Sequence, residues 1–568
     1  MKPNWTRRRF VGVGPGVAAS SLAASRRPSA GTPEREAAPR VDGGKRKLPR
    51  LIYYNDAHHF HAKRIDPPVS RFQLQRPVDE VLGTGVGMLV LGLGYGDVYF
   101  HDSKVGRVVG QEKQTWEHII DWRIMCMVRD ARMLGTDQLR EVIRRGREES
   151  LPVLPSLKLQ DGNRPGSQRC GWLKWKQGKS VCIAEPDQKH PGFEYCYDFS
   201  LNSVREDKLA MVREVLKDYR ADGIELDFMF FSAYFKKRDV EKNLPVMNRF
   251  VRQVRELADG VGRSRNRAIT VSARVFHRKE ENLRVGLDVE TWLRQGDVDL
   301  VVGQVSDQLF EPAVDVGWMV DAAGGRAGVY VRPPLRVYDE RTPRPTIEMY
   351  RALGQSLRSQ GANGLYLGYL RWPLARKEHQ ILREMAYPET YRRESKRYFL
   401  QPAEGAGIFT DPPPGRVLPL ALKEGEWAGL TLQVADDLEE AANDGELRRP
   451  RLTLRLQNFP VEDEIRIRLN GRLLPWERFE VTDERALRIP VRLRRPIEAP
   501  SGFAAHWLRT KLDPKLLRQG ENRVEILARR LTPTASWTRF VSGVEIRTRY
   551  RSFARPEGIK GADRIEPS

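Results

Sequence analysis

Cysteine is scarce in this chain, with four residues in 568 and none in a Cys-x-x-Cys pair. This scarcity excludes a scaffold built from disulfides. Three of the four, Cys170, Cys182 and Cys196, fall in one segment rich in Gly, Lys and Pro. A Cys170–Cys182 bridge and three free thiols in a loop both fit this spacing, and the sequence leaves the two open.

Long apolar runs and nucleic-acid motifs are also missing. No stretch of eighteen or more apolar residues occurs, so we expect no segment to span a bilayer after processing. The net charge of +22 includes twelve Lys and Arg against three acids in residues 1–50, and about +13 remains, spread diffusely, over the rest. Without a recognition helix, an RNA-binding strand motif or a zinc-finger spacing, we expect no nucleic-acid partner; an acidic polysaccharide suits such a charge better.

A targeting segment stands at the amino terminus. Thr6, Arg7, Arg8, Arg9 and Phe10 follow the S/T-R-R-x-F order of twin-arginine signals, and a weakly apolar, small-residue stretch comes next. Residues 26–48 have the Pro-, Gly-, Ala- and charge-rich composition of a linker. We therefore predict a bacterial protein exported to the periplasm or secreted, with residues 1–48 as signal peptide and linker.

Between residues 51 and 390, β-rich runs alternate with amphipathic helical stretches such as 205–220 and 244–262, which indicates βα units around a parallel sheet. Eight strands are expected, at 50–56, 87–94, 151–158, 222–228, 268–276, 298–306, 328–335 and 363–370. Eight is the number that closes a barrel, so the fold predicted for residues 49–395 is a (β/α)8 TIM barrel. The long segment 159–200 is expected to be a lid or binding loop.

The pattern changes after Pro412-Pro413-Pro414-Gly415. No helical period follows, and we expect short strands at 429–435, 451–458, 464–474, 487–493, 522–529 and 543–551, with turn signals such as Asn470-Gly471. This is typical of an all-β sandwich of the jelly-roll kind. We predict an accessory domain over residues 396–555 and a tail over 556–568.

The fourth barrel strand carries two acids inside an apolar run. Alternate side chains of a barrel strand face inward, so Glu225 and Asp227 share the inner face and Asp227 lies nearer the carboxyl end, where barrel enzymes place their active sites. Mutual repulsion raises one pKa, and one protonated and one ionised carboxyl are what glycoside hydrolysis requires. We predict Asp227 as nucleophile or base.

The remaining roles are open at this stage. Glu225 is one candidate for the general acid, and Asp307, near the end of the sixth strand, is the other. Alternatively, Glu225 pairs with an internal arginine such as Arg274 and holds the barrel together, so that only Asp227 touches substrate. Asp307 can equally be a helix N-cap or a loop acid.

The order of residues here resembles the glycoside hydrolase family 10-like group of bacterial barrel proteins. The resemblance rests on Asp198, the Val204-Arg205 pair, the Tyr219-x-x-Asp222-Gly223-Ile224-x-Leu226-Asp227 motif and the segment 286–302. It covers residues 50–390 and implies a barrel hydrolase acting on glycosidic bonds. The Asn-Glu dipeptide of family 10 xylanases is absent from the fourth strand, so a xylanase mechanism is not carried over.

A sugar substrate needs aromatic faces for stacking and polar groups at the strand ends. The candidates are Asn55, His58, Tyr95, Asp97, His101, Lys158, Arg274, Gln304, Arg332, Tyr369 and Trp372. Several cations among them suit a uronate or a sulfated sugar. For each aromatic residue, packing in the core or under a lid is an equally good reading.

Two other functions fit the same barrel. His59-x-His61 after the first strand and His277 after the fifth occupy positions where barrel metal hydrolases hold ligands, but the fourth, sixth and eighth strands lack the further ligands that such a site uses. We therefore expect neither a metal nor another cofactor. The second alternative is a non-catalytic carbohydrate-binding barrel, in which the acids serve only as hydrogen-bond acceptors.

Overall fold

The computed structural model describes residues 48–111, 115–116, 118–188, 190, 192–305, 310–337, 344–400, 418–485 and 504–551. Within these residues, none of the helices combines the length and the apolar character needed to cross a membrane. The predicted signal segment and the carboxyl-terminal tail lie outside the described residues.

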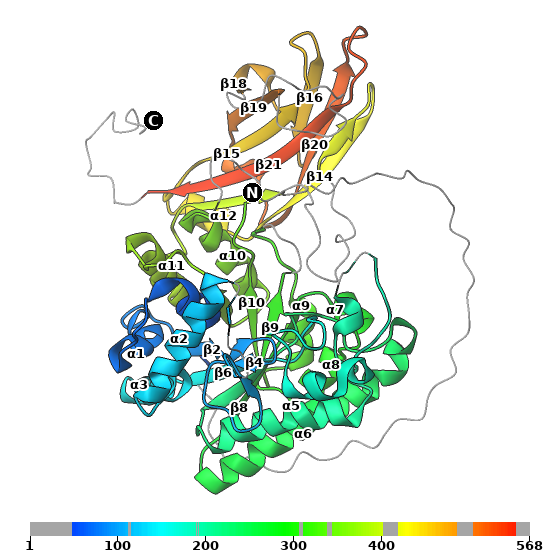
Figure 1. Ribbon diagram of the computed structural model, residues 1–568. Coiled ribbons are helices and arrows are strands. Elements are labelled where there is room, and N and C mark those ends of the chain that lie inside the picture. The colour runs from blue at the N-terminus through cyan, green and yellow to red at the C-terminus, as the bar shows by residue number, and fades with distance from the viewer. Residues whose placement is uncertain are drawn as a thin grey trace. The chain divides into compact units, whose positions relative to one another are not determined.

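Eight parallel strands form a closed barrel (Figure 1). In spatial order they are β1 (Leu51–Asn55), β11 (Gly364–Gly368), β10 (Gly328–Arg332), β9 (Leu300–Gln304), β8 (Thr270–Phe276), β7 (Gly223–Asp227), β6 (Val153–Lys158) and β2 (Met88–Gly92). Each lies within one of the eight expected segments, so the predicted TIM barrel is confirmed. The strands form because short apolar, β-branched runs end at turn residues.

Helices surround the barrel. They include α1 (Arg71–Asp79), α2 (Ile119–Met133), α3 (Gln138–Glu148), α5 (Asn202–Lys217), α6 (Val240–Arg265), α7 (Lys279–Arg284), α8 (Val289–Gln295), α9 (Gly317–Ala323), α10 (Ile347–Ser359) and α11 (Arg376–Ala386). The apolar face of α5, with Leu209, Val212 and Val215, is buried against the sheet, as the helical spacing of these residues predicts.

Two apolar clusters of the barrel part of the chain include residues of the barrel strands. The larger lies between the strands and the helices. The smaller fills the barrel interior and consists of Ile52, Tyr54, Met88, Val90, Leu154, Leu300, Val302, Tyr330 and Tyr366. This inner cluster shows which residues of β1, β2, β6, β9, β10 and β11 face the axis, because the faces alternate along a strand.

The long connection after β6 packs into the molecule. It contains α4 (Trp172–Gln177) and two short 3-10 turns, and its Cys170, Lys174, Cys196 and Tyr197 are fully buried. The described residues of this connection are therefore anchored by buried side chains, while others, such as Trp175 and Lys176, are exposed. That it serves as a lid or binding loop stays a prediction. All four cysteines are free and buried.

The carboxyl-terminal part is made of antiparallel sheets. One runs in the order β12 (Lys396–Leu400), β21 (Arg539–Tyr550), β15 (Leu447–Gln457), β19 (Ala504–Lys511) and β18 (Glu480–Arg485), with β13 (Leu420–Leu422) also on β21. The other runs β14 (Trp427–Val434), β20 (Gly520–Arg530), β16 (Glu464–Leu469) and β17 (Arg472–Leu473). Their alternating buried residues, such as Leu454, Ile526 and Val544, form a separate core.

These sheets confirm the predicted β-sandwich. Five of the six expected strands are found at or near the expected positions, and the expected strand at 487–493 lies outside the described residues. The short helix α12 (Leu438–Asn443) follows β14 and was not expected, because residues after 415 show no helical period. The domain boundaries at 49, 395 and 555 stay predictions.

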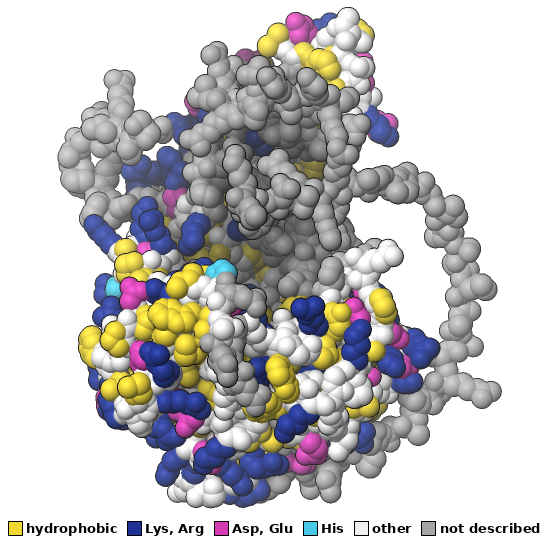
Figure 2. All heavy atoms as spheres, in the orientation of Figure 1, with side chains coloured by type: hydrophobic (Ala, Val, Ile, Leu, Met, Phe, Trp, Pro, Cys, Tyr) yellow, Lys and Arg dark blue, Asp and Glu magenta, His cyan; other side chains and the backbone are white. Residues whose placement is uncertain are grey.

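The positive charge is spread over the surface. On the face drawn in Figure 2, Lys and Arg side chains are scattered among acidic and apolar ones. This agrees with the diffuse excess of positive charge in the sequence.

Close strand packing makes Gly223 sensitive to substitution. An added Cβ there would overlap the carbonyl oxygen of Thr270 on β8, whereas at Gly260 in α6 the nearest atom is the flexible end of Arg263 at 3.9 Å. We expect Gly223→Ala to lower the free energy of unfolding by about 1–3 kcal/mol. The control, Gly260→Ala, should raise it by about 0.5–1 kcal/mol. Urea unfolding checks both, and equal effects would contradict the packing argument.

Candidate active site

The carboxyl ends of six barrel strands carry inward-facing polar side chains. The inward position at this end is Asp56, Gln304 or Arg332 on strands where it lies two residues beyond Tyr54, Val302 or Tyr330 of the inner apolar cluster. It is Lys158, Asp227 or Arg274 on strands where it lies two residues beyond the inward polar residues Ser156, Glu225 or Ser272. We call these six residues the mouth ring. On the other two strands the position is Gly92 or Gly368, where an added Cβ would lie 2.7 Å from the carbonyl oxygen of Asp56 or Tyr54.

Strand register places Asp227 between two cations. Lys158 on β6 and Arg274 on β8 are its direct partners in the parallel pairing. Arg274 forms a two-point ion pair with the carboxylate, its Nε donating to Oδ1 at 3.1 Å and its Nη2 to Oδ2. The backbone N–H of Met229 also donates to Oδ1, at 2.8 Å. Asp227 has no exposed surface, so the ion pair offsets the desolvation of its charge.

Glu225 lies one layer deeper. Its Oε1 accepts hydrogen bonds from Ser156 Oγ at 2.7 Å and from Tyr366 OH at 3.0 Å, and its Oε2 finds no partner among the described residues. Burial raises the pKa of Glu225; the charge on Arg274 opposes this shift and that on Asp227 adds to it. Arg274, which the sequence offered as a partner for Glu225, forms its ion pair with Asp227 instead.

Lys158 completes the floor of the mouth. Its ammonium group donates to the carbonyl oxygen of Gly94 at 2.8 Å and lies 4.5 Å from the ring centre of Phe230. Burial lowers the pKa of Lys158, while the charges on Asp56 and Asp227 act in the opposite direction. The sequence analysis did not single out Phe230, because position alone does not show which aromatic residue after β7 turns toward the mouth.

Aromatic and imidazole rings line the rim. The ring of His58 packs edge-on against Tyr95 at 5.4 Å, and the ring of His59 packs edge-on against Tyr369 at 5.3 Å. The guanidinium group of Arg332 also lies over the ring of Tyr369, 5.3 Å from the ring centre. Burial lowers the pKa of His58 to about 4. The structure thus brings four of the predicted rim residues into contact.

The side chains of Asp56 and Asn55 bind backbone N–H groups of the residues that follow β1. The carboxylate of Asp56 accepts the backbone N–H of His59 at 2.9 Å and bonds the ring Nδ1 of the same residue. Burial opposes ionisation of Asp56, but the hydrogen bond from the His59 ring lowers its pKa overall. Asn55 accepts the N–H of Ala57 through its side-chain oxygen at 3.0 Å.

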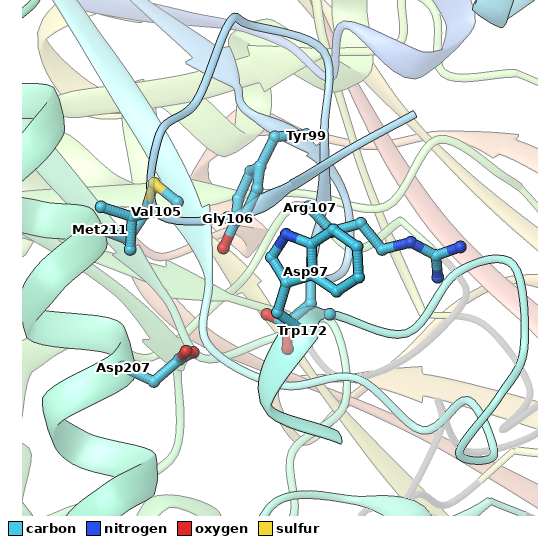
Figure 3. A pocket seen from close by; sticks show the side chains of 9 residues that line it. Asp97, Tyr99, Val105, Gly106, Arg107, Trp172, Asp207 and Met211 are labelled. Atoms are coloured by element: carbon cyan, nitrogen blue, oxygen red, sulfur yellow. The ribbon is translucent and has the colours of Figure 1, made fainter. Parts of the chain in front are cut away.

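Asp97 and His101 lie away from the mouth. Asp97 pairs with the fully buried Lys208 of α5 and lines, with Trp172 and Asp207, a cavity of about 10 Å³ (Figure 3). Such a cavity holds one water molecule at most. The buried Lys208 requires a nearby negative charge, and Asp97 supplies it. This position does not fit the prediction that Asp97 binds substrate.

His101 is also part of the packing around α5. Its Nε2 lies 3.6 Å from a carboxylate oxygen of Glu214, and its ring contacts Tyr99 and Tyr219 at 5.3 and 5.2 Å. It is 1% exposed. The sequence placed His101 near the mouth because it follows the second strand closely, but the intervening strands β3 (Gly94–Tyr95) and β4 (Val98–Tyr99) turn the chain outward.

Two predicted residues remain to be located. Trp372 donates from its indole Nε1 to Glu80 at 3.2 Å and stacks with Arg64, so it lies beside the rim, part-exposed, rather than in the mouth ring. Asp307 lies outside the described residues. Next to Tyr369, the ends of β10 and β11 enclose a cavity of about 450 Å³, lined also by Arg371 and by the first turns of α10 and α11.

The structure does not join His59, His61 and His277, the residues that the alternative of a metal hydrolase would use. His61 is buried with its Nδ1 2.8 Å from the carbonyl oxygen of Ala57, and its ring packs on Phe100. His277 Nδ1 lies 3.3 Å from the carbonyl oxygen of Gln304, on the far side of the barrel from β1. Each ring is held by local packing.

Comparisons with known proteins give only distant likenesses. No protein-family model matches the chain, and no curated protein sequence matches it. The predicted resemblance to the glycoside hydrolase family 10-like group therefore stays a prediction.

Solved structures similar to the chain include three carbohydrate-active proteins. A cycloisomaltooligosaccharide glucanotransferase from Paenibacillus sp., complexed with cycloisomaltoheptaose, is 9% identical over 87% of this chain and 57% of that one, with a TM-score of 0.35. α-L-Fucosidase isoenzyme 2 from Paenibacillus thiaminolyticus is 12% identical over 62% and 51%, with a TM-score of 0.38. An α-galactosidase from Thermus thermophilus in complex with stachyose is 14% identical over 59% and 64%, with a TM-score of 0.36.

The chain thus spans little more than half the length of the first two structures. At these identities and TM-scores the likeness carries no argument about activity. What defines the class of this protein is its own strand topology, a TIM barrel with a polar mouth ring and a separate β-sandwich.

The raised pKa of Glu225 predicts how stability depends on pH. Above the ordinary value of 4.5 the unfolded chain loses the proton that the folded chain keeps, so this carboxyl reduces stability as pH rises toward its folded pKa. We expect the free energy of unfolding of the wild type, relative to Glu225→Gln, to fall as pH rises above 4.5. Urea unfolding of both proteins over a pH series measures this difference; a difference that grows with pH would contradict the assignment.

Proposed function

We propose that this protein is a glycoside hydrolase that binds a poly- or oligosaccharide over the mouth of its TIM barrel. The observation that carries the proposal is the mouth ring at the carboxyl ends of the strands, flanked by Tyr95 and Tyr369. Ring faces stack on sugars while charged groups bind hydroxyls, and barrel enzymes use this end of the barrel.

The two carboxyl groups of β7 differ in their surroundings. Asp227 accepts hydrogen bonds from Arg274 and from the backbone of Met229, which suits a nucleophile or base. Burial raises the pKa of Glu225, which is the direction that a general acid needs. Asp307, which lies outside the described residues, remains the other candidate for the acid, because it follows β9 in the sequence.

One observation favours a second function, a non-catalytic carbohydrate-binding barrel. Asp227 and Glu225 have no exposed surface, and Asp227 is already saturated by Arg274. Catalysis requires the residues that bury these two carboxyl groups to move when a sugar binds. Binding by the exposed rim alone requires no such movement.

Substitution of Asp227 separates these functions. We expect Asp227→Asn to lower kcat for a cleaved glycan at least about 100-fold, the lower limit for loss of acid–base catalysis. Asp222→Asn is the matched control, since Asp222 precedes the same strand and pairs with Arg267 at 2.7 Å, at the amino end. It should reduce thermal stability and leave kcat within a few fold.

Reducing-sugar release from a panel of neutral, uronic and sulfated polysaccharides measures the activity. If the wild type binds a glycan of the panel and cleaves none, the non-catalytic function is supported. If Asp227→Asn cleaves as fast as the wild type, Asp227 is not the catalytic carboxylate.

The charge at the mouth supports an acidic carbohydrate. The mouth ring holds three cations against two carboxylates, and the neighbouring cavity of about 450 Å³ is lined by Arg344, Arg371 and Lys377 with one acid, Glu378. In the described residues, Glu378 already accepts the backbone N–H of Ala375 at 3.1 Å. A carboxylate or sulfate on the substrate would meet a positive surface.

Arg332 provides the test of this substrate class. We expect Arg332→Gln to raise KM for an acidic glycan about tenfold, or about 1.4 kcal/mol, and to leave KM for a neutral one unchanged. Arg326→Gln, at the amino end of the same strand and exposed, is the control and should change neither. Equal effects of Arg332→Gln on neutral and acidic substrates would contradict an anion-binding role.

Export through the twin-arginine route completes the proposal. Its support is the Thr6–Phe10 sequence and the linker-like composition of residues 26–48. The β-sandwich is proposed as an accessory domain, since the candidate catalytic groups belong to the barrel.

A further inference from the structure

The end of β1 gathers three groups that can ligate a metal ion. A nitrogen of His58, a nitrogen of His59 and a carboxylate oxygen of Asp56 all lie within 4.8 Å of one another. They belong to one short segment, and they stand at the barrel mouth, where Asp56 is a member of the mouth ring. The sequence spacing suggested the alternate residues His59 and His61 instead; the chain leaves β1 in a tight helical turn, which turns His61 away.

The second observation concerns the ring of His58. Its Nε2 atom is buried and has no hydrogen-bond partner, although a buried polar nitrogen without a partner is unfavourable. The other histidines of the segment differ, because His59 Nδ1 is bound to Asp56 and His61 Nδ1 faces the carbonyl oxygen of Ala57. A ligand at Nε2 would remove this penalty.

The donor set has a definite chemical preference. Two imidazole nitrogens and one carboxylate oxygen suit first-row divalent cations, and three protein ligands leave positions open for water or substrate. Donors about 2.1 Å from one ion lie about 3–3.5 Å apart, so donor atoms that lie within 4.8 Å of one another are close to the spacing that one ion requires. The backbone N–H of His59 holds the Asp56 carboxylate at this place.

We propose that Asp56, His58 and His59 bind one first-row divalent cation of the zinc or cobalt type at the barrel mouth. The site is distinct from the carboxylate pair of β7, and it stands whether or not the chain hydrolyses glycosidic bonds. A cation held here would present its open positions to whatever occupies the rim between Tyr95 and Tyr369.

Lys158 tunes this site. Lys158 and Asp56 are both members of the mouth ring, so the positive charge of Lys158 faces the same mouth and weakens the binding of another cation there. Replacement of Lys158 by methionine should tighten cation binding, whereas loss of either imidazole should weaken it. The opposite signs of these effects distinguish a specific site from general attraction to the surface.

Asp56 has another possible role, which is to cap the helical turn that follows β1 without binding a metal ion. Asp56 accepts the N–H of the third residue after it, as an N-cap residue does, and such a cap brings His59 close without any metal. The chain contains a matched example: Asp187 accepts the backbone N–H of His190 at 3.3 Å and faces its Nδ1 at 2.9 Å. In the described residues, no second imidazole joins that pair to form a ligand group.

Calorimetric titration of the full chain, without a histidine tag, with Zn²⁺ tests the proposal. We expect one ion per chain for the wild type, binding weakened at least about tenfold in His58→Asn and in His59→Asn, and unchanged binding in His190→Asn. Lys158→Met should bind more tightly. Thermal unfolding without metal verifies that each variant is folded.

Cobalt gives an independent readout, because Co²⁺ held by imidazole and carboxylate in a tetrahedral or five-coordinate site absorbs visible light. The absorption should appear with one equivalent in the wild type and disappear in His58→Asn. No saturable binding by the wild type, or equal binding by the wild type and both imidazole variants, would overturn the proposal and leave Asp56 as a helix cap. Neither result depends on glycan cleavage, so failure here is distinguishable from failure of the proposed function.

Discussion

The ion pair between Asp227 and Arg274 is the interaction on which the mouth of the barrel depends. Both side chains are almost completely buried, and removing charges from water is unfavourable unless each charge meets its opposite with good geometry. The parallel register of β7 and β8 places the two residues directly beside each other. The guanidinium group of Arg274 binds both carboxylate oxygens of Asp227 and stacks over the ring of Tyr54. This ion pair therefore holds the side chains at the base of the barrel mouth in place.

The same requirement explains why other polar residues collect elsewhere. Lys174 and Lys208 are fully buried on either side of the Tyr197 ring, and they draw Asp161 and Asp97 into the layer beside α5. Acids used as counter-charges there are not available at the mouth. The barrel mouth and the connection after β6 are therefore two distinct polar centres, and the first lies at the end of the barrel where TIM-barrel enzymes place their active sites.

Much of the fold could be predicted from the sequence, because it depends on local pattern. The eight barrel strands are short apolar runs bounded by turn residues, and each was found within its expected segment. In the sandwich, β14, β15, β16 and β20 alternate apolar and polar residues and were expected as well. Strands β12, β18 and β19 were not expected, since Lys396–Leu400, Glu480–Arg485 and Ala504–Lys511 mix charged and apolar residues without a clear period of two.

The candidate site was also predictable only in part. Alternation along a strand, a property of the sequence, determined that Lys158, Asp227, Arg274 and Arg332 belong to the inner face at the carboxyl end. Only the tertiary structure decided the partners: Arg274 binds Asp227 rather than Glu225, Asp97 and His101 turn outward to α5, and His58 joins Asp56 and His59. Strand period fixes the side on which a residue lies, whereas pairing depends on the register between strands and on where each loop turns, which are long-range properties of the folded chain.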